Sequence, residues 1–462
     1  MKRILTFVVL LAVPRVSSAA VIHVLPDGSG DAPTIAAALV IAASPDTISL
    51  GPGTFYENDL VWKDGVALIS DTGDPATTFI DAQDLGRCID LTNTNAQRTI
   101  RGITFMNGTT AGVGGLVKGD NSRYRFETCV FRDGSANQGG AVGTTLGFFP
   151  GYSPFYSDCL FENNTATSGG AFCGQGGALG CTFRGNNATN GGAAYIQKPP
   201  FDGGGGFNGC VFSDNQASGD GGAIFSTGNQ NQVPYGNWIQ NCDFRGNQAQ
   251  NGGAVRLSQY DIADRNNYFE NVATNAGGAI YAVGVMVTEK YEGGEISYST
   301  IARNTAAFGG GIVLVGGGPL YFNHNTIVAN SAPTGANLGF QGNVETFCNF
   351  AERCIVAFGV GGAAAAGSNM EVCCFDVYGN EGGDWVGPLA GQLGTNGNIS
   401  ADPLFCGAAA DNYTLAVGSP CYQPPQCGSV NAIGRYGIGC GVPNSVEATS
   451  WGKIKGLYTS PR

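Results

Sequence analysis

The sequence has few charged residues and almost no histidine. Charged side chains make up 13% of the 462 residues, about half the usual share of roughly 25%. A disordered chain would carry more charge and fewer apolar residues than the 43% found here. Only two histidines occur, His23 and His324. This scarcity argues against a histidine zinc site and against a Ser-His-Asp triad.

Basic residues and long apolar runs are also scarce. The chain has 23 basic against 35 acidic residues, a formal net charge of −12, so it lacks the basic face that nucleic-acid binding requires. The acidic balance also repels acidic polysaccharides unless a cation such as Ca²⁺ bridges the two. No apolar run reaches the length of a bilayer span, so we predict no membrane span in the mature chain.

The first 20 residues have the layout of a secretory signal peptide. Lys2 and Arg3 precede an apolar run over residues 4–13, and small residues follow at 17–20. We predict cleavage near Ala19 or Ala20; the alternative is a short N-terminal anchor. No cysteine lies just after this point, which argues against a lipid anchor. Export to the extracellular space or the outer cell surface would let disulfides persist.

Glycine, by contrast, is abundant. The chain has 75 glycines, more than twice the typical share of roughly 7%. They do not fall at every third position, as collagen requires. Together with an ordinary apolar share, this composition indicates many tight turns between short buried strands.

One pattern recurs along the chain, Phe-x-x-Asn followed by Gly-Gly-Ala. Clear copies begin at Phe161, Phe183, Phe212 and Phe244. Successive copies start 22 to 32 residues apart, a period typical of solenoids. The segments are short and apolar and show no helical heptads, which predicts an all-β protein whose repeat is one coil of a parallel β-helix. Weaker copies begin at five other apolar residues, Phe105, Phe131, Phe269, Ile301 and Ile327.

The spacing within a copy predicts which side chains point inward. Cysteine stands two residues before the Phe in five successive copies, and side chains at i and i+2 share one strand face. We therefore expect both residues to be buried and to stack on their counterparts, the cysteines as small apolar groups rather than reactive thiols. The cysteines are Cys129, Cys159, Cys181, Cys210 and Cys242, and small residues continue the position at Asn267, Ser299 and Asn325.

The asparagine of the motif predicts a second stack. Asparagine tolerates left-handed backbone and can bond neighbouring backbone at a corner, so successive copies would form an amide ladder. The Gly-Gly pair predicts another corner, with positive φ or a close approach of two backbones. The ladder would contain Asn164, Asn186, Asn215, Asn247, Asn304 and Asn330, with interruptions at Gly134 and Val272.

One arm of each coil carries insertions. The segment between the second Gly and the next copy varies from 13 to 23 residues, so the extra residues should gather on one side of the solenoid, often the binding side. The insertions are rich in aromatic residues, whose faces can stack against sugar rings; the alternative is that they pack on the outer wall. The candidate ligand-binding residues are Phe149, Tyr152, Tyr156, Phe201, Tyr235 and Trp238.

A second candidate site is charged. A polysaccharide lyase needs a base to remove the proton beside a uronate and a cation to neutralise the carboxylate. If the protein is an enzyme, the candidate catalytic residues are Asp261, Asp264, Arg265 and Lys290. Asp261 and Asp264 with Glu295 are the candidate Ca²⁺ ligands, and no other cofactor is indicated. The alternative is that all of these are solvated loop charges.

The two ends differ from the repeats. Residues 21–60 predict strand, helix and strand, with the helix over 32–43 and its cap near Asp31 or Ala32. Such a helix would cover the open end of the solenoid. Residues 346–440 predict a disulfide-stapled C-terminal cap rather than a zinc site, because the segment lacks histidine and paired Cys-x-x-Cys. Its eight cysteines are Cys348, Cys354, Cys373, Cys374, Cys406, Cys421, Cys427 and Cys440.

These features divide the chain into five parts. A signal peptide (1–20) precedes an N-terminal cap with the first coils (21–104). The repeats (105–345) lead into the Cys-rich terminal coils and cap (346–440), and a weakly basic tail follows (441–462).

The best copies of the repeat resemble a known family. Phe212 to Asn215 with Gly221 to Ile224 resembles the repeats of polymorphic outer-membrane proteins, which are surface-displayed right-handed β-helices. The start of the chain, with Asp27 to Asp31, resembles the first coils of the pectin-lyase-like superfamily. The segment from Asp402 to Phe405 resembles the closing coil of secreted bacterial right-handed β-helix repeat proteins. The resemblance implies a right-handed parallel β-helix solenoid.

The pectin-lyase-like superfamily contains lyases, hydrolases and esterases, but none of their catalytic motifs transfers here. The nearest match to a pectate lyase Trp-Ile-Asp-His stretch runs from Trp238 to Asn241, with Asp and His both replaced. We therefore predict a secreted or cell-surface monomer without catalytic activity that binds glycan or a surface partner through its aromatic loops. The alternative is a polysaccharide lyase or glycoside hydrolase with a divergent site.

Overall fold

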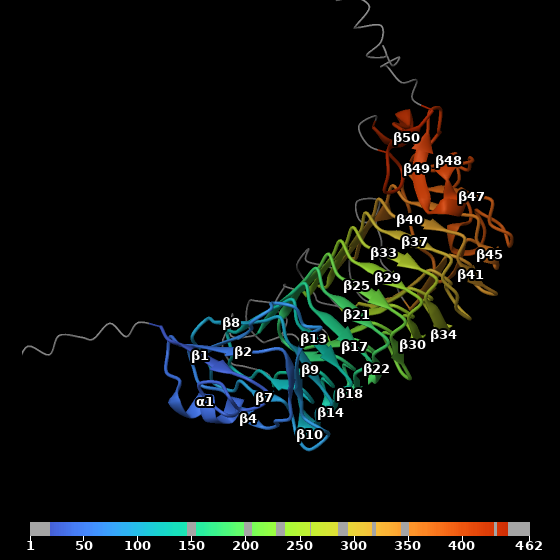
Figure 1. Ribbon diagram of the computed structural model, residues 1–462. Coiled ribbons are helices and arrows are strands. Elements are labelled where there is room, and N and C mark those ends of the chain that lie inside the picture. The colour runs from blue at the N-terminus through green and yellow to red at the C-terminus, as the bar shows by residue number, and fades with distance from the viewer. Residues whose placement is uncertain are drawn as a thin grey trace, which may run out of the picture.

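The computed structural model describes residues 19–145, 154–197, 206–227, 236–258, 260–284, 294–316, 320–342, 351–428 and 432–441. Over these residues the chain winds into a parallel β-helix, which confirms the predicted fold class (Figure 1). Each coil contributes strands to long sheets in the order A, B, D, C, where sheet D is present only in the middle coils. Parallel pairing stacks the coils into one continuous core.

Sheets A and B each contain 13 strands and are joined by a tight turn. Sheet A consists of β1 (Val21–Val24), β2 (Thr47–Leu50), β5 (Ala67–Ser70), β8 (Thr99–Arg101), β12 (Arg125–Glu127), β16 (Phe155–Ser157), β20 (Gly177–Leu179), β24 (Gly206–Asn208), β28 (Trp238–Gln240), β32 (Ile262–Asp264), β36 (Gly294–Ser297), β39 (Leu320–Asn323) and β43 (Ala351–Glu352). Sheet B consists of β3 (Gly53–Phe55), β6 (Thr78–Asp81), β9 (Thr104–Met106), β13 (Val130–Arg132), β17 (Leu160–Glu162), β21 (Thr182–Arg184), β25 (Val211–Ser213), β29 (Asp243–Arg245), β33 (Asn267–Phe269), β37 (Thr300–Ala302), β40 (Thr326–Val328), β44 (Ile355–Ala357) and β47 (Asp376–Tyr378).

Sheets D and C complete each coil with seven and 12 strands respectively. Sheet D consists of β10 (Thr109–Val113), β14 (Ser135–Gln138), β18 (Thr165–Ser168), β22 (Asn187–Asn190), β26 (Gln216–Ala217), β30 (Gln248–Asn251) and β34 (Val272–Ala276), and a separate pair, β41 (Ser331–Ala332) and β45 (Val360–Gly361), follows it. Sheet C consists of β4 (Leu60–Val61), β7 (Ile89–Asp90), β11 (Val117–Lys118), β15 (Val142–Gly143), β19 (Phe172–Gly174), β23 (Ala194–Ile196), β27 (Ile224–Ser226), β31 (Val255–Leu257), β35 (Ile280–Val283), β38 (Ile312–Val315), β42 (Leu338–Gln341) and β46 (Ala365–Gly367).

The Gly-Gly pairs form the corner between sheets D and C, as their sequence predicts. Gly221 has φ +68, a conformation that glycine adopts without strain. A Cβ on Gly222 would lie 2.0 Å from the carbonyl oxygen of Gly253 in the next coil. The first glycine is therefore required by backbone conformation and the second by the close approach of two coils.

A short helix lies at the N-terminal end, as predicted, but it begins later than expected. Helix α1 (Ile35–Ile41) is capped by Thr34, whose Oγ1 accepts a hydrogen bond from the Ala37 amide at 3.0 Å. The Glu57 carboxylate accepts from the next free amides, those of Ile35 and Ala36. These contacts fix the helix start at residue 35 rather than 32. Ile35 and Leu39 are buried against the first coil.

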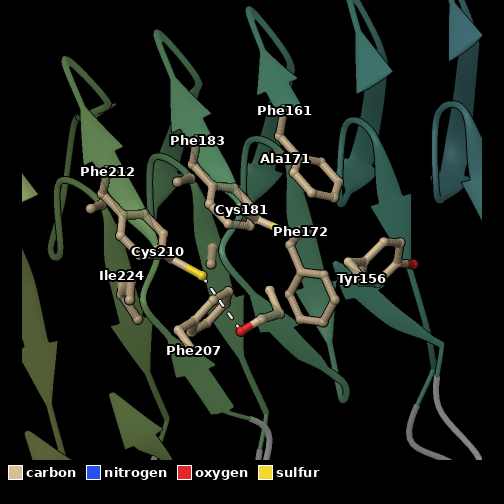
Figure 2. Close-up of a cluster of buried hydrophobic side chains, with 14 of the residues drawn as sticks. Tyr156, Phe161, Ala171, Phe172, Cys181, Phe183, Phe207, Cys210, Phe212 and Ile224 are labelled. Carbon is tan, nitrogen blue, oxygen red and sulfur yellow. Dashed lines mark hydrogen bonds between the residues drawn. The ribbon is translucent and has the colours of Figure 1, made fainter. Parts of the chain in front are cut away.

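Aromatic rings stack along the inside of sheet B, which confirms that the Phe of the motif points inward (Figure 2). The ring centroids of Phe161 and Phe183 are 4.6 Å apart, and Phe212 lies 4.8 Å from both Phe183 and Phe244. These separations match the spacing of neighbouring strands, about 4.8 Å. Stacking therefore follows directly from the parallel register.

The next coil differs from the prediction by one residue. The ring stacked on Phe244 is Tyr268, at 4.8 Å, whereas Phe269 lies on the outer side of sheet B, beneath the guanidinium groups of Arg245 and Arg303. The ladder position in this coil is therefore Asn271 rather than Val272, and the predicted interruption is absent.

The asparagine ladder runs without a gap through these coils. Each Nδ2 donates to Oδ1 of the next asparagine at 2.8 to 3.0 Å. Each Nδ2 also donates to a main-chain carbonyl of sheet B. At the start, the Gly134 amide donates to Asn164 Oδ1. The donors are Asn164, Asn186, Asn215, Asn247, Asn271, Asn304 and Asn330, all buried.

The cysteine column is buried as predicted. The Cys159 amide donates to Cys181 Sγ at 3.4 Å, and burial raises the pKa of the Cys159 thiol, so the column does not present reactive thiolates. Because of the register shift, the column continues at Asn266 rather than Asn267, and Asn266 Oδ1 accepts from the Cys242 amide at 2.9 Å.

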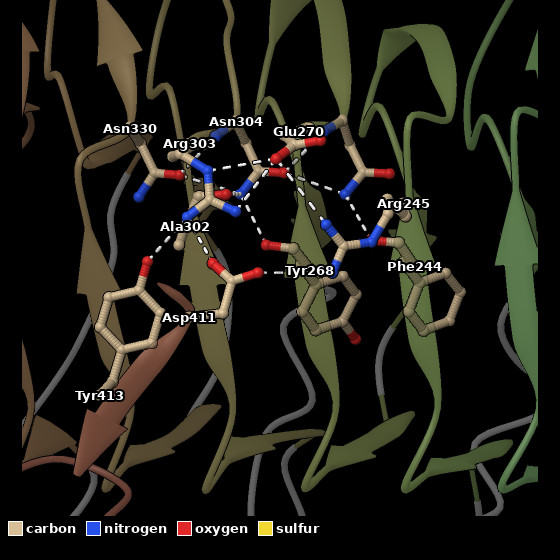
Figure 3. Close-up of polar contacts among 11 residues, drawn as sticks. Phe244, Arg245, Tyr268, Glu270, Ala302, Arg303, Asn304, Asn330, Asp411 and Tyr413 are labelled. Carbon is tan, nitrogen blue, oxygen red and sulfur yellow. Dashed lines mark hydrogen bonds and ion pairs between the residues drawn. The ribbon is translucent and has the colours of Figure 1, made fainter. Parts of the chain in front are cut away.

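The C-terminal segment folds back along the outer side of sheet B. It contains a small sheet of β48 (Phe405–Gly407), β49 (Asn412–Ala416) and β50 (Ile438–Cys440), with short 3-10 turns at Gly387–Leu389, Ala408–Ala410 and Pro425–Cys427. Arg303 joins it to the solenoid through Asp411 at 2.7 Å, Tyr413 at 3.0 Å and, within sheet B, Glu270 at 3.0 Å (Figure 3). Leu415 packs in the same apolar cluster as Phe269.

The disulfide prediction is correct in part. Cys374–Cys427 and Cys406–Cys440 form disulfides, and Cys373 is also disulfide-bonded. Cys354 and Cys421 are free and buried, so the prediction was wrong for both. Cys354 belongs to the inner cysteine column, whose Sγ accepts from the Asn325 amide, and Cys421 donates to Asp376 Oδ2 at 3.0 Å. Cys348 lies outside the described residues.

Candidate functional site

The strands that flank the insertions meet at a single corner, between the ends of sheet C and the starts of sheet A. The points where the insertions are attached therefore lie on one side of the solenoid, as predicted. We call this edge the C–A corner. Four of the predicted aromatic residues, Phe149, Tyr152, Phe201 and Tyr235, lie outside the described residues, as does Lys290.

The outer face of sheet A carries three of the remaining candidates, Trp238, Asp264 and Glu295. Trp238 begins β28 and is 52% exposed. Its neighbours across the strands are Ile262, then Glu295, then Tyr321. An exposed indole thus lies two strands from a carboxylate on one face. A large exposed aromatic flanked by polar groups is a typical surface for stacking against a sugar ring.

Asp264 lies on the same face, at the end of β32, and Arg265 follows it in the turn between sheets A and B. Asp264 is mostly buried and forms an ion pair with Arg265, whose side chain is 56% exposed. Ser297 Oγ lies 3.1 Å from Asp264 Oδ1 and 2.5 Å from Glu295 Oε1. The hydroxyl carries one proton, so it can donate to only one of these carboxylates at a time.

Arg265 heads a column of ring and cationic side chains in the turn between sheets A and B. Its guanidinium carbon lies 5.3 Å from the centroid of the Tyr298 ring, which stacks on His324 at 4.6 Å. Burial, followed by the charge of Arg353, lowers the pKa of His324 to about 4, so the imidazole is neutral at pH 7. Neither ring nitrogen has a hydrogen-bond partner in the described part of the chain.

The C-terminal segment supports this turn from outside. Arg435 donates through Nη2 to the Arg265 carbonyl at 3.1 Å and through Nη1 to the Asn266 carbonyl at 2.9 Å. Arg265 has φ +55, and the residues at the same turn position in the neighbouring coils, Asn241 and Tyr298, are left-handed as well. The main chain of this turn is thus bonded to a segment 170 residues away in sequence.

Asp261 does not join this group. It is 1% exposed, and its carboxylate accepts from the amides of Asn237 at 2.9 Å and Ser258 at 2.7 Å. It therefore closes a main-chain turn and is not available as a general base. Among the described residues no three His, Cys, Asp or Glu side chains converge as a metal site.

Tyr156 is also misplaced by the sequence prediction. It is 1% exposed and stacks on Phe126 at 5.1 Å, inside the solenoid (Figure 2). It lies three residues before a column cysteine, Cys159. In neighbouring coils this position holds an inward-facing apolar residue. Tyr156 is therefore a core residue and cannot meet a ligand on the outer face.

Sequence reasoning missed Tyr298 and His324. Both stand three residues before the apolar residue that stacks inside sheet B, as Arg265 stands three before Tyr268. Aligning the coils on the inward residue would have placed the three side chains in one column.

Comparison with known proteins supports the fold. The model of the Chlamydia polymorphic membrane protein repeat matches residues 158–179 and 209–227. The PL6 family alginate lyase AlyGC is similar over 80% of this chain and 52% of its own, with 13% identity and a TM-score of 0.50. This chain thus spans about half the length of that lyase. At such low identity the likeness shows the parallel β-helix alone.

Two other solved structures are similar at lower scores. A PL6 family polysaccharide lyase from Pseudopedobacter saltans has 11% identity and a TM-score of 0.47, covering 78% of this chain and 88% of its own. Pectate lyase Pel9A has 14% identity and a TM-score of 0.33, covering 92% and 97%. A search of curated protein sequences gave no match. Among the described residues, no helix is long and apolar enough to cross a membrane.

Proposed function

We propose that this protein is an exported β-helix protein that binds polysaccharide on the outer face of sheet A beside the C–A corner, without chemically changing it. The observation that carries this proposal is the half-exposed Trp238 on the same face as Asp264 and Glu295, with Arg265 in the adjoining turn. The matched repeat of surface-membrane proteins supports a location at the cell surface or outside the cell, with residues 1–20 as the signal peptide.

The proposed chemistry divides between stacking and polar contacts. The Trp238 indole offers an apolar face to the C–H side of a sugar ring. Arg265 is exposed and paired with one carboxylate, and such an exposed pair contributes little stability. Its guanidinium can therefore also donate to a sugar hydroxyl or to the carboxylate of a uronate. Glu295 and Ser297 add acceptors for sugar hydroxyls.

A second candidate function is a polysaccharide lyase or glycoside hydrolase. The similar structure AlyGC is an alginate lyase, which supports testing uronate polymers as substrates. The column of Arg265, Tyr298 and His324 is the feature that favours this function, since it aligns a cation, a phenol ring and a neutral imidazole. His324 is only 8% exposed, so proton removal would need a route past Tyr298.

One experiment separates the two functions. Purified protein is run by affinity electrophoresis through gels containing alginate, pectate or a neutral glucan, with and without Ca²⁺, and product is followed by unsaturated-uronate absorbance and reducing ends. In the alginate and pectate gels we expect retardation without product, and loss of that retardation in Trp238→Ala. Tyr56→Ala is the matched control, because Tyr56 is 63% exposed and belongs to the N-terminal coils.

The outcomes are distinct. Product that disappears in both Arg265→Ala and His324→Ala, with binding kept, would replace the binding proposal with the enzyme. Retardation in alginate or pectate that is equal in Trp238→Ala and Tyr56→Ala would remove sheet A as the site. Absence of both retardation and product in every gel would contradict both functions and favour a protein partner.

A further inference from the structure

Sheet D presents an outer face with no charge. Its seven strands contain no Asp, Glu, Lys or Arg, although the chain carries a net charge of −12. Alternate residues point inward as buried alanines, including Ala188, Ala217 and Ala249. The intervening outward residues are Thr, Asn, Gln or Ser in the central strands, and they are exposed. Small inward residues keep the strands evenly stacked, so the outward side chains form regular polar rows.

The central strands of this face are hollowed into a shallow groove of about 270 Å³. This is near the lower end of the range for small-ligand sites, about 300–1,000 Å³. The polar residues that line it come from four adjacent coils: Asn187, Gln216, Ser218, Gln248, Gln250 and Thr274. The groove therefore crosses the strands, along the solenoid axis.

The groove amides contrast with those at the edge of the sheet. Asn190 Oδ1 accepts from the Asp220 amide, Asn251 Nδ2 donates to Asp220 Oδ1, and Asn275 Nδ2 donates to Asn251 Oδ1. The side chains of Gln216 and Gln248 make no hydrogen bond to the described part of the chain. The edge is therefore tied together, while the groove offers donors and acceptors to a ligand.

We propose that this groove binds a neutral, hydroxyl-rich polysaccharide chain, at a site separate from sheet A. Amide groups donate and accept, which matches the sugar hydroxyl group. An acidic polymer would find no cation here, and a nucleic acid would find no basic side chain. A protein partner or second copy would need apolar or aromatic anchors, and Val272, 38% exposed, is the single large apolar side chain exposed on the strands of this face.

The test uses affinity electrophoresis of the full chain in hydroxyethyl cellulose and in glucomannan, both neutral, and in alginate, which is acidic. The variant Gln216→Ala/Gln248→Ala/Gln250→Ala removes three amides, and we expect at least a tenfold weaker apparent affinity for a neutral polymer, from about 0.5–1.5 kcal/mol per hydrogen bond. Gln248→Glu alone should also weaken it, because it adds a charge without removing bulk.

The same variants are made in a Trp238→Ala background, so that failure of the sheet A site and failure of this groove are seen separately. Unchanged urea midpoints show that the substitutions leave the fold intact. Retardation in a neutral polymer that persists in Trp238→Ala and falls in the triple variant supports the groove. No retardation in either neutral polymer, no effect of the triple variant, or a dimer that the triple variant dissociates would each overturn the proposal.

Discussion

The buried asparagine ladder should contribute a large part of the stability of the central coils. Asn247 is fully buried and makes four side-chain hydrogen bonds. Its Oδ1 accepts from the amide and Nδ2 of Asn215, and its Nδ2 donates to Phe212 and Asn271. Asn247→Ala removes all four and leaves buried donors unpaired. At about 0.5–1.5 kcal/mol each, the expected loss is about 4 kcal/mol.

Urea unfolding followed by circular dichroism measures this loss. For a urea dependence of about 1–3 kcal/mol/M, the midpoint should fall by roughly 1–4 M. Asn275→Ala is the matched control, because Asn275 is exposed and donates a single side-chain bond, to Asn251 at 2.8 Å. Hydrogen exchange should show lost protection at Asn215, whose amide loses its partner. A midpoint shift for Asn247→Ala no larger than that for Asn275→Ala would refute the reasoning.

Four further predictions concern buried groups. Phe212→Ala removes a ring stacked on two others and should lower the free energy of unfolding by about 3–5 kcal/mol in the same assay. Tyr156→Phe should leave stability unchanged or raise it, because the Tyr156 hydroxyl has no partner among the described residues. This variant should also keep polysaccharide retention. Burial raises the pKa of Asp376 to about 6. Since the folded pKa exceeds the unfolded one, the contribution of Asp376 to stability should be complete below about pH 4 and be lost as pH rises through about 6. Asp376→Asn should remove this part of the pH dependence of the melting temperature. Reducing Cys374–Cys427 opens a loop of 53 residues and should lower the free energy of unfolding by about 4 kcal/mol. The measurement is limited proteolysis, which should become faster after residue 400.

The repeat could be predicted from the sequence because the same physical constraints recur in every coil. Inward rings, small residues two positions earlier and the asparagine corner all occupy fixed places, so the fold and most of the core follow from the pattern. The error at Phe269 arose where two aromatics are adjacent, Tyr268 and Phe269. The ladder residue decides between them, because Asn271 lies three residues after Tyr268, the same spacing as in the other coils.

The candidate site was less predictable because it depends on contacts across the chain. Asp261 looks like a free carboxylate in the sequence, and only the fold shows its two main-chain donors. The free Cys421 bonds to Asp376, 45 residues away. The support of Arg265 by Arg435 has no sequence signal at all. Tyr156 could have been placed correctly, since it stands where Phe126 and Phe207 stand relative to their column cysteines.

The C–A corner attaches loops to the solenoid at regular intervals. The loops of the repeat region leave from one edge, so peptides grafted there from adjacent coils would be held at the strand spacing, about 4.8 Å. Loop length varies without disturbing the asparagine and ring columns on the other walls. Coils can thus be added, removed or exchanged in whole units. Each such change alters the number and sequence of the loops at this edge while the spacing between them stays the same.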